Sequence, residues 1–230
     1  MTDMNEHIIR PIAHIESDFS GKFGIPRQAG VVEALRARVV FDGEYRNDEA
    51  LRGIEGFSHL WLIWHFSEAE REAWSPTVRP PRLGGNVRMG VFATRSPFRP
   101  NALGLSCVRL LGVEKVEGKG TTLLVGGADL MDGTPIFDVK PYVPYADAHP
   151  EAAGGFAPDP GKTLEVEFEA AALEKVPAEK REALRGVLAN DPRPRYQDDP
   201  ERVYAMSFAG LNVRFQVREN TLTVAEVERL

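Results

Sequence analysis

The sequence predicts a mainly β protein: an antiparallel or mixed β-barrel domain that is not of the Rossmann type, followed by a small α+β domain. Three observations lead to this fold class. Strand-like segments follow one another through residues 1–150 without a helix of crossover length, which disfavours a doubly wound parallel sheet. No Gly-x-Gly-x-x-Gly follows a strand, and no Walker loop is present. The composition changes after residues 148–162, which are rich in Ala, Gly and Pro and read as a linker.

The first domain, residues 1–150, contains apolar segments that are separated by glycine and proline. The predicted strands are residues 8–15, 34–41, 59–66, 87–94, 103–113 and 121–126. The third segment is so dense in aromatic and branched side chains that we expect a central strand buried on both faces. Residues 21–30 and 76–86 are predicted loops, and residues 47–53 a short helical turn with an Asn or Asp cap.

The second domain is predicted at residues 163–230. Residues 164–169 alternate apolar and acidic side chains, as in a half-exposed strand. Residues 177–190 carry apolar side chains at helical spacing, with a proline near the start. Residues 212–218 alternate cleanly and turn back into residues 222–224, which predicts a hairpin.

Composition excludes several classes of protein. The 230 residues are 43% hydrophobic and 27% charged, which is ordinary for a globular protein that needs no disulfide or metal staple. The one cysteine, Cys107, lies in an apolar run and is expected to be a buried, inert thiol. We find no signal peptide and no run of membrane-spanning length, so we expect a cytoplasmic protein with no membrane partner. The net charge of −6 argues against a general nucleic-acid coat protein but allows a local basic site.

Metal chemistry and serine hydrolysis are also disfavoured. The five histidines are scattered, and the single cysteine excludes a thiolate cluster. His59 and His65 share one face of a predicted strand, but we interpret them as core or barrel-lining residues. No Gly-x-Ser-x-Gly elbow occurs. We therefore expect no metal site.

Charge is segregated between Ser75 and Val113, where the chain has six arginines, no lysine and no acidic residue. These are Arg79, Arg82, Arg88, Arg95, Arg99 and Arg109. Guanidinium groups grip carboxylate or phosphate as planar forks, and they stack on flat rings. The stretch therefore points to an anionic ligand, to RNA, or to both.

A second unusual segment, residues 129–145, places three aspartates among turn-forming residues and two tyrosines beside prolines. Within it, Asp138 can accept a proton from an exocyclic amino group, and Tyr142 can stack a base. The plainer interpretation is a turn with aspartate caps and a surface tyrosine. That interpretation is favoured for the segment alone, but not beside the arginine stretch.

A third segment, residues 191–196, is a stiff loop with two prolines that presents Arg193, Arg195 and Tyr196. Two guanidiniums and a ring can grip phosphate and stack a nucleobase. A helix stop with solvated arginines explains the same residues equally well, so both interpretations stay open.

Taken together, these segments resemble the TsaA-like (TrmO) family of S-adenosylmethionine-dependent tRNA adenosine N6-methyltransferases. The matching segments follow in order along nearly the whole chain: residues 26–30, 56–61, 74–86, 88–101, 129–145 and 191–196. The resemblance implies a β-barrel methyltransferase domain and a homodimer with the cofactor near the subunit interface. It also implies methylation of N6 in N6-threonylcarbamoyladenosine, immediately 3′ of the tRNA anticodon.

The resemblance further implies roles for single residues. S-adenosylmethionine contacts fall, by matching motif, at Pro26, Arg27, Gln28, Phe66, Ser67, Arg95, Leu105, Gly126, Gly127, Ala128 and Asp129. Arg95 or Arg99 would bind the threonylcarbamoyl carboxylate, Asp138 or a backbone carbonyl would accept the N6 proton, and Tyr142 would stack the purine. The tRNA anticodon loop would be held by Arg99, Lys140, Arg193, Arg195 and Tyr196.

Two hypotheses from other classes remain open. A non-catalytic RNA-binding module would keep the arginines but would need no cofactor site. An enzyme acting on a small anionic metabolite would leave the loop of residues 191–196 without a role.

Overall fold

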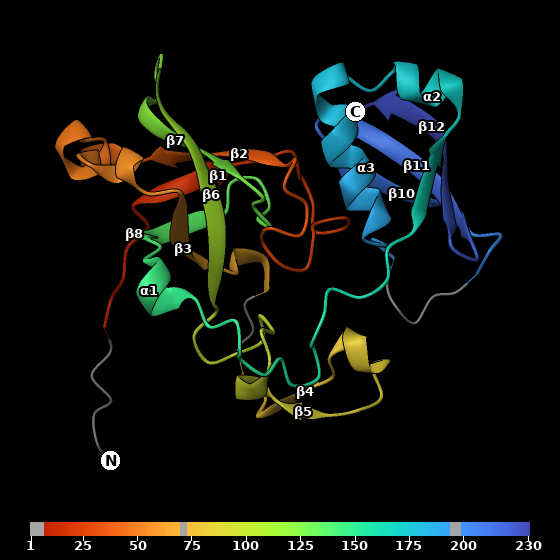
Figure 1. Cartoon of the computed structure of the whole chain (residues 1–230), viewed down its shortest axis with the longest axis horizontal. Coiled ribbons are helices and arrows are strands. Elements are labelled where there is room, and N and C mark those ends of the chain that lie inside the picture. The colour runs from red at the N-terminus through yellow and green to blue at the C-terminus, as the bar shows by residue number, and fades with distance from the viewer. Residues whose placement is uncertain (1–6, 70–72, 194–198) are drawn as a thin grey trace.

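The protein is described by a computed structural model that covers residues 7–69, 73–193 and 199–230. Six strands close into a barrel in the order β1-β2-β7-β6-β3-β8, and every neighbouring pair is antiparallel (Figure 1). The strands are β1 (Ala13–Glu16), β2 (Arg36–Phe41), β3 (His59–His65), β6 (Leu103–Val116), β7 (Gly120–Gly126) and β8 (Pro135–Pro141). The predicted fold class of the first domain is therefore confirmed.

The interior of the barrel is filled by every second side chain of its strands, because alternate side chains point inward. Ile15, Val39 and Leu123 lie opposite one another on β1, β2 and β7, and none has exposed surface. On β3, Leu60 and Leu62 are fully buried, but the odd-numbered residues from His59 to His65 are only partly buried. The expectation that this strand is buried on both faces is thus wrong. An antiparallel barrel strand packs one face on the core and leaves the other to the outside.

Other elements of the barrel differ in extent from the prediction. β1 begins at Ala13, later than expected, because Ile8 and Ile9 are exposed and pair with no described strand. The strand predicted at residues 87–94 shrinks to β5 (Met89–Gly90), which pairs with β4 (Thr77–Val78) and is followed by the 3-10 turn η6 (Val91–Ala93). We call residues 74–92 the hairpin arm. β8 was not predicted, because prolines stand at both of its ends and Asp138 at its centre, so that its segment resembles a series of turns.

The predicted turn after Asn47 is confirmed as the 3-10 helix η2 (Asp48–Leu51). The Asn47 side chain accepts a hydrogen bond of 3.0 Å from the Glu49 amide and caps the turn. Such capping satisfies an amide that has no partner within the turn itself.

The C-terminal part, residues 165–230, forms a four-stranded sheet in the order β10-β11-β12-β9. Its strands are β9 (Glu165–Phe168), β10 (Tyr204–Phe208), β11 (Leu211–Arg218) and β12 (Thr221–Arg229). The helices α2 (Ala170–Glu174) and α3 (Arg181–Ala189) pack against it. The predicted helix, hairpin and first strand are present, whereas β10 was missed.

Two clusters of buried side chains result, one inside the barrel and one between the C-terminal sheet and its helices. The second cluster also takes up Phe19, Val32 and Leu35, which belong to the segment between β1 and β2. The short helix α1 (Pro144–Asp147) ends the barrel part, and residues 148–164 then cross to the C-terminal sheet without a helix or strand (Figure 1). Within the described ranges, no helix has the length and apolar character to cross a membrane.

Candidate functional site

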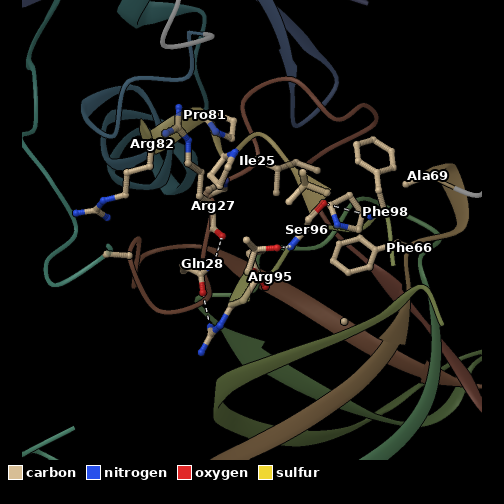
Figure 2. Close-up of a pocket in the computed structure, with 18 of the residues that line it drawn as sticks. Ile25, Arg27, Gln28, Phe66, Ala69, Pro81, Arg82, Arg95, Ser96 and Phe98 are labelled. Carbon is tan, nitrogen blue, oxygen red and sulfur yellow. Dashed lines mark hydrogen bonds between the residues drawn. The ribbon is translucent and has the colours of Figure 1, made fainter. Parts of the chain in front are cut away.

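A long cleft lies where the barrel, the hairpin arm, the linker and the C-terminal part meet. Its floor is the end of β3 and the start of β6. Its walls come from residues 22–31, 75–101, 153–162 and 187–193. Figure 2 shows Arg27, Gln28 and Arg95 on one side of the view and Phe66, Ser96 and Phe98 on the other.

The floor of the cleft is aromatic, and a glycine makes room for it. Trp64 lies across the strand pair from Gly104, and a Cβ at Gly104 would come within 2.2 Å of the indole ring. Only glycine therefore fits at this position of β6. The ring centroids of Trp64 and Phe66 are 4.2 Å apart. Leu105, on the face of β6 opposite to Gly104, is 55% exposed and also lines the cleft. This surface suits a flat or apolar part of a ligand.

A carboxylate is set into the cleft beside this floor. The Trp64 indole N–H donates to Ser106 Oγ at 3.0 Å, and Ser106 Oγ donates to Asp129 Oδ1 at 2.6 Å. Burial raises the pKa of Asp129 above its ordinary value, while the hydrogen bond from Ser106, backbone amides and the charge of Arg95 act in the opposite direction. Asp129 is thus a partly buried acid whose charge interacts with that of Arg95.

Arg27, Gln28 and Arg95 form a polar wall above that floor. Arg95 Nη1 donates to Gln28 Oε1 (Figure 2). Arg27 Nη2 donates to the Arg193 carbonyl at 3.5 Å. Arg27, Gln28 and Arg95 are all exposed to the cleft. Two guanidiniums on one wall can bind a carboxylate or phosphate through charge-assisted hydrogen bonds.

Arg99 has a different task from Arg95. Its Nη1 donates to the carbonyls of Thr94 and Ser96, at 3.0 and 3.3 Å, so its guanidinium closes the loop in which both arginines lie. Within the same loop, the Ser96 amide donates to Thr94 Oγ1 at 3.2 Å. The loop is therefore braced from inside, and it presents Arg95 outward.

The acid-free stretch identified in the sequence folds into one positive wall. Of its arginines, Arg109 alone does not line the cleft. Arg82 pairs with Asp159 of the linker at 3.0 Å, which ties the hairpin arm to the linker. Arg79 and Arg88 are exposed and have no carboxylate within ion-pair distance among the described residues. Cations outnumber carboxylates along the cleft as a whole.

Three residues that were expected to contact the cofactor lie instead behind the segment that carries Arg27 and Gln28, and they support it. Gly126, Gly127 and Ala128 are buried and do not line the cleft. The Gly30 amide donates to the Gly127 carbonyl at 2.8 Å, and a Cβ at Gly127 would lie 3.1 Å from Gly30 Cα. The close approach and the positive φ of 72° both require glycine at Gly127. The other residues expected to contact the cofactor do line the cleft, and their contact with it stays a prediction; they are Pro26, Arg27, Gln28, Phe66, Ser67, Arg95, Leu105 and Asp129.

Residues 17–35, which carry Arg27 and Gln28, pack against the C-terminal part and are held in place by it. Lys180 Nζ pairs with Asp18 at 2.6 Å, and both side chains are largely buried. The rings of Phe23 and Phe215 stack with centroids 6.5 Å apart. Val32 packs on Gly186 of α3 so closely that a Cβ there would lie 2.7 Å from Val32 Cγ1. One wall of the cleft is thus positioned by the second hydrophobic core.

The structure does not bring Asp138, Lys140 and Tyr142 to the cleft, and this corrects the expected arrangement within one chain. Asp138 pairs with Lys140 at 2.7 Å on the outer side of β8. Tyr142 packs on His59 and Trp61, at the start of β3. The cleft begins at the other end of β3, and a strand of this length spans roughly 20 Å. The sequence could not show which end and which face these residues occupy.

Arg193 lines the cleft, but it is not a surface cation. It is only 8% exposed, and its guanidinium makes two hydrogen bonds to the Asp191 carboxylate, at 2.8 and 3.0 Å. The predicted phosphate contact is therefore not available at Arg193, which instead helps to shape the loop after α3. Arg195 and Tyr196, the other predicted tRNA contacts of this loop, lie outside the described residues.

The sequence pointed to Asp129 but missed the hydrogen bonds that link it through Ser106 to Trp64. A glycine inside an apolar strand, Gly104, was the available signal, because it marks a close approach of another group. Cys107 is only partly buried, on the outer face of β6, although a buried thiol was expected. Burial still raises its pKa, followed by the charge of Asp147, which disfavours a reactive thiolate. In the ranges that the structure describes, no His, Cys, Asp or Glu side chains cluster as metal ligands would.

The fold and the site define a class: a β-barrel protein whose arginine-lined, aromatic-floored cleft suits a ligand that is both flat and anionic. Two family models match the chain, the tRNA-methyltransferase O N-terminal domain at residues 14–148 and the TrmO C-terminal domain at residues 161–230. The chain belongs to the tRNA-methyltransferase O family.

Individual relatives agree with this membership. The chain is 41% identical to the tRNA (adenine(37)-N6)-methyltransferase of Escherichia coli K12, over 98% of its own length and 99% of that protein. It is 41% identical to a "Probable S-adenosyl-L-methionine-binding protein" of Pyrococcus abyssi, over 60% of its length and 69% of that protein. A crystal structure of TrmO from Pseudomonas aeruginosa superimposes with a TM-score of 0.82 at 34% identity, covering 98% of this chain and all of that one.

Proposed function

We propose that this protein transfers a methyl group from S-adenosylmethionine to N6 of N6-threonylcarbamoyladenosine at position 37 of tRNA. Similarity to the Escherichia coli tRNA (adenine(37)-N6)-methyltransferase over the full chain supports the reaction and the nucleoside position. The observation that carries the proposal is the convergence of Arg27, Gln28, Phe66, Arg95 and Asp129 on one cleft. S-adenosylmethionine and an anionic nucleoside together need cations, a carboxylate and an aromatic surface, and these residues supply all three.

The side chains of the cleft fit S-adenosylmethionine chemically. Its amino-acid carboxylate calls for a guanidinium, which Arg27 or Arg95 offers. Its ribose hydroxyls and its cationic groups call for an acceptor, which the Asp129 carboxylate offers. Its flat adenine calls for an apolar or aromatic surface, which Phe66 and Leu105 provide. When bound, the cofactor supplies an activated sulfonium methyl group.

The protein then has to orient the target nitrogen and keep water out, rather than to activate the methyl. Arg95 would hold the threonylcarbamoyl carboxylate, because it is exposed while Arg99 is engaged by its own loop. The N6 proton has to leave to an acceptor, and in one chain Asp129 is the carboxylate that lies in the cleft next to Arg95. Its raised pKa makes it a better proton acceptor than an ordinary surface aspartate.

We also propose that the protein works as a homodimer in the cytoplasm, with its C-terminal part, residues 163–230, contacting tRNA. The outer face of β3 and β6 presents Trp61, Ile63, Leu103 and Leu105, and Leu105 is 55% exposed. A second copy packed on this face would cover that apolar surface, and it would join the cleft to the face that carries Tyr142. Asp138 and Tyr142 remain candidates for catalysis only in such an assembly.

The proposed substrate is tested with tRNA from cells that can and cannot make the threonylcarbamoyl modification. An unmodified adenosine would leave the Arg95 guanidinium without its carboxylate, so we expect catalytic efficiency to fall roughly a hundredfold or more. Equal methylation of both tRNAs would contradict the carboxylate-binding role. Binding of tRNA without any binding of S-adenosylmethionine would favour a non-catalytic RNA-binding module, and binding of neither would favour a small anionic metabolite as the substrate.

A further inference from the structure

Two large aromatic rings are exposed at the base of the hairpin arm. Trp74 is 52% exposed and Phe92 is 73% exposed, and their rings stack with centroids 6.1 Å apart at an angle of 29°. The pairing of β4 with β5 and a 2.9 Å hydrogen bond from the Val91 amide to the Pro76 carbonyl hold them side by side. Exposure of two stacked rings on an arm that leaves the barrel is unusual for a surface without a ligand.

The same arm carries cations that the protein does not neutralise. Arg79 and Arg88 are exposed, and neither lies within ion-pair distance of a carboxylate in the part of the chain that the structure describes. Arg88 Nη1 donates to Thr77 Oγ1 at 3.2 Å, which holds this guanidinium along the hairpin. No acidic residue occurs between Ser75 and Val113. The arm therefore offers flat apolar surface and positive charge together.

We propose that the hairpin arm binds unpaired RNA nucleotides next to the target base, with Trp74 and Phe92 stacking a base and Arg79 and Arg88 holding phosphates. The proposal rests on the proposed function, because it takes RNA as the substrate. Stacking surfaces combined with cations are the usual means of binding single-stranded nucleic acid. Bases in a loop are already splayed, and they can reach such a platform more easily than paired bases.

The position of the arm agrees with this role. Phe92, Arg79 and Arg88 line the same cleft as Arg95, so a base stacked on the arm would neighbour the nucleotide at Arg95. Figure 1 shows the arm, with β4 and β5, reaching out from the barrel beside the linker. A second copy of the chain is a poorer occupant, because a twofold contact centred on the arm would bring its arginines against each other.

The test uses Trp74 as its own reporter. The chain has three tryptophans, and Trp74 is the exposed one, whereas Trp64 is 8% exposed and Trp61 is half-buried with its indole N–H bonded to Asp147. Titration with an unmodified anticodon stem-loop RNA should quench tryptophan fluorescence. Trp74→Phe should abolish the quenching but keep most of the affinity. Trp74→Ala should weaken binding roughly 10- to 100-fold.

Charge is tested separately from stacking. Arg79→Ala and Arg88→Ala should each reduce the slope of log affinity against log salt by about one. Phe57→Ala, which removes another exposed ring that does not line the cleft, is the matched control and should leave RNA affinity unchanged. All variants should bind S-adenosylmethionine as the wild type does, which shows that they are folded.

Three results would overturn the platform while leaving methyl transfer intact. These are unchanged stem-loop affinity in Trp74→Ala, equal quenching by a fully paired RNA duplex, and a change of sedimentation in Trp74→Ala that makes the rings a subunit contact. A wild-type protein that binds S-adenosylmethionine but not the stem-loop would also overturn it. Conversely, quenching by the stem-loop in a protein that does not bind S-adenosylmethionine would support the platform and refute the proposed methyl transfer.

Discussion

Arg95 and Arg99 lie four residues apart in one loop, yet the structure gives them different surroundings. Arg99 donates to two carbonyls of its own loop, whereas Arg95 reaches Gln28 and is exposed to the cleft. The sequence identified both as cations for the substrate, because their spacing and the absence of acids are visible in it. It could not separate the exposed arginine from the one that closes the loop, since that depends on the fold of the loop.

Arg95→Ala should therefore reduce methyl transfer without unfolding the protein. Loss of a hydrogen bond to a charged group costs about 1.5–3 kcal/mol, so we expect roughly a 10- to 150-fold loss in kcat/KM. The same variant should lose most of its preference for the threonylcarbamoylated tRNA, which steady-state kinetics on both tRNAs would show.

Arg99→Ala should keep that preference, although a looser loop would lower overall efficiency. Arg52→Ala, at an exposed arginine far along the chain from the arginine stretch, serves as the matched control and should change neither quantity. If Arg99→Ala, and not Arg95→Ala, abolished the preference, the roles assigned to the two arginines would be reversed.

Asp129 gives a pH-dependent prediction. Its folded-state pKa is raised, mainly by burial, above the value of about 3.9 for an unfolded aspartate. The stability it contributes is fully present below the unfolded pKa, and it is lost as pH rises through the folded pKa. Asp129→Asn should therefore melt at a higher temperature than the wild type at neutral pH. The difference should shrink as pH falls through the raised folded pKa, and it should have vanished once pH is below the unfolded value of about 3.9.

Calorimetric melting of the wild type and Asp129→Asn between neutral pH and a pH below about 4 checks the prediction. Binding of S-adenosylmethionine to the two proteins supplies a second comparison. We expect the more stable Asp129→Asn variant to bind the cofactor more weakly, because a functional charge is often kept at a cost in stability. A variant that is less stable than the wild type at neutral pH would show that ionised Asp129 is a structural group.

At the scale of elements, the segment of residues 17–35 joins the two halves of the molecule. It leaves the barrel after β1, enters the second hydrophobic core through Phe19, and returns to β2 after presenting Arg27 and Gln28. The sequence showed this segment as a Gly/Pro loop and part of a motif. Its apolar residues pack in the core of the C-terminal part. This packing joins residues far apart in the sequence, so the periodicity of the sequence does not reveal it.

Gly186→Ala should disturb this segment from a distance. Alanine favours the helix by about 1 kcal/mol, but its Cβ would lie 2.7 Å from Val32 Cγ1, so Val32 has to move. We expect S-adenosylmethionine to bind several-fold more weakly, as isothermal titration would measure, because the wall that carries Arg27 shifts.

The double variant Gly186→Ala with Val32→Ala should recover the affinity, because it removes the clashing methyl group. Gly112→Ala is the matched control, since a Cβ at Gly112 would meet no atom within 4 Å. Failure of the double variant to recover affinity would mean that α3 does not position the cofactor wall through Val32.

Other elements show where local patterns suffice and where they fail. The helix at α3 and the hairpin of β11 and β12 were predicted because each carries its own periodicity and its own turn. β3 was predicted as a strand, but its outer face was not, because density of apolar residues does not tell a central strand from a barrel strand. β8 was hidden by the aspartates and prolines that made its segment look like turns.

At the scale of the whole molecule, the proposed homodimer accounts for the apolar outer face of β3 and β6. Ile63→Asp would place a charge in the middle of this face, opposite Leu105. Sedimentation at a fixed concentration should then show a shift from dimer to monomer, while near-ultraviolet circular dichroism shows that the barrel is intact. A wild-type protein that sediments as a monomer would refute the dimer, and with it the remaining catalytic roles of Asp138 and Tyr142.

The most direct test of the whole account is to follow the methyl group itself. The protein is incubated with methyl-deuterated S-adenosylmethionine and tRNA that carries N6-threonylcarbamoyladenosine, and the nucleosides are then analysed by mass spectrometry. We predict that the deuterated methyl appears on N6 of that one nucleoside, next to the anticodon, and that Arg95→Ala strongly reduces the yield. A methyl group on any other nucleoside, or none on the tRNA, would contradict the proposal that this cleft is a tRNA adenosine methylation site.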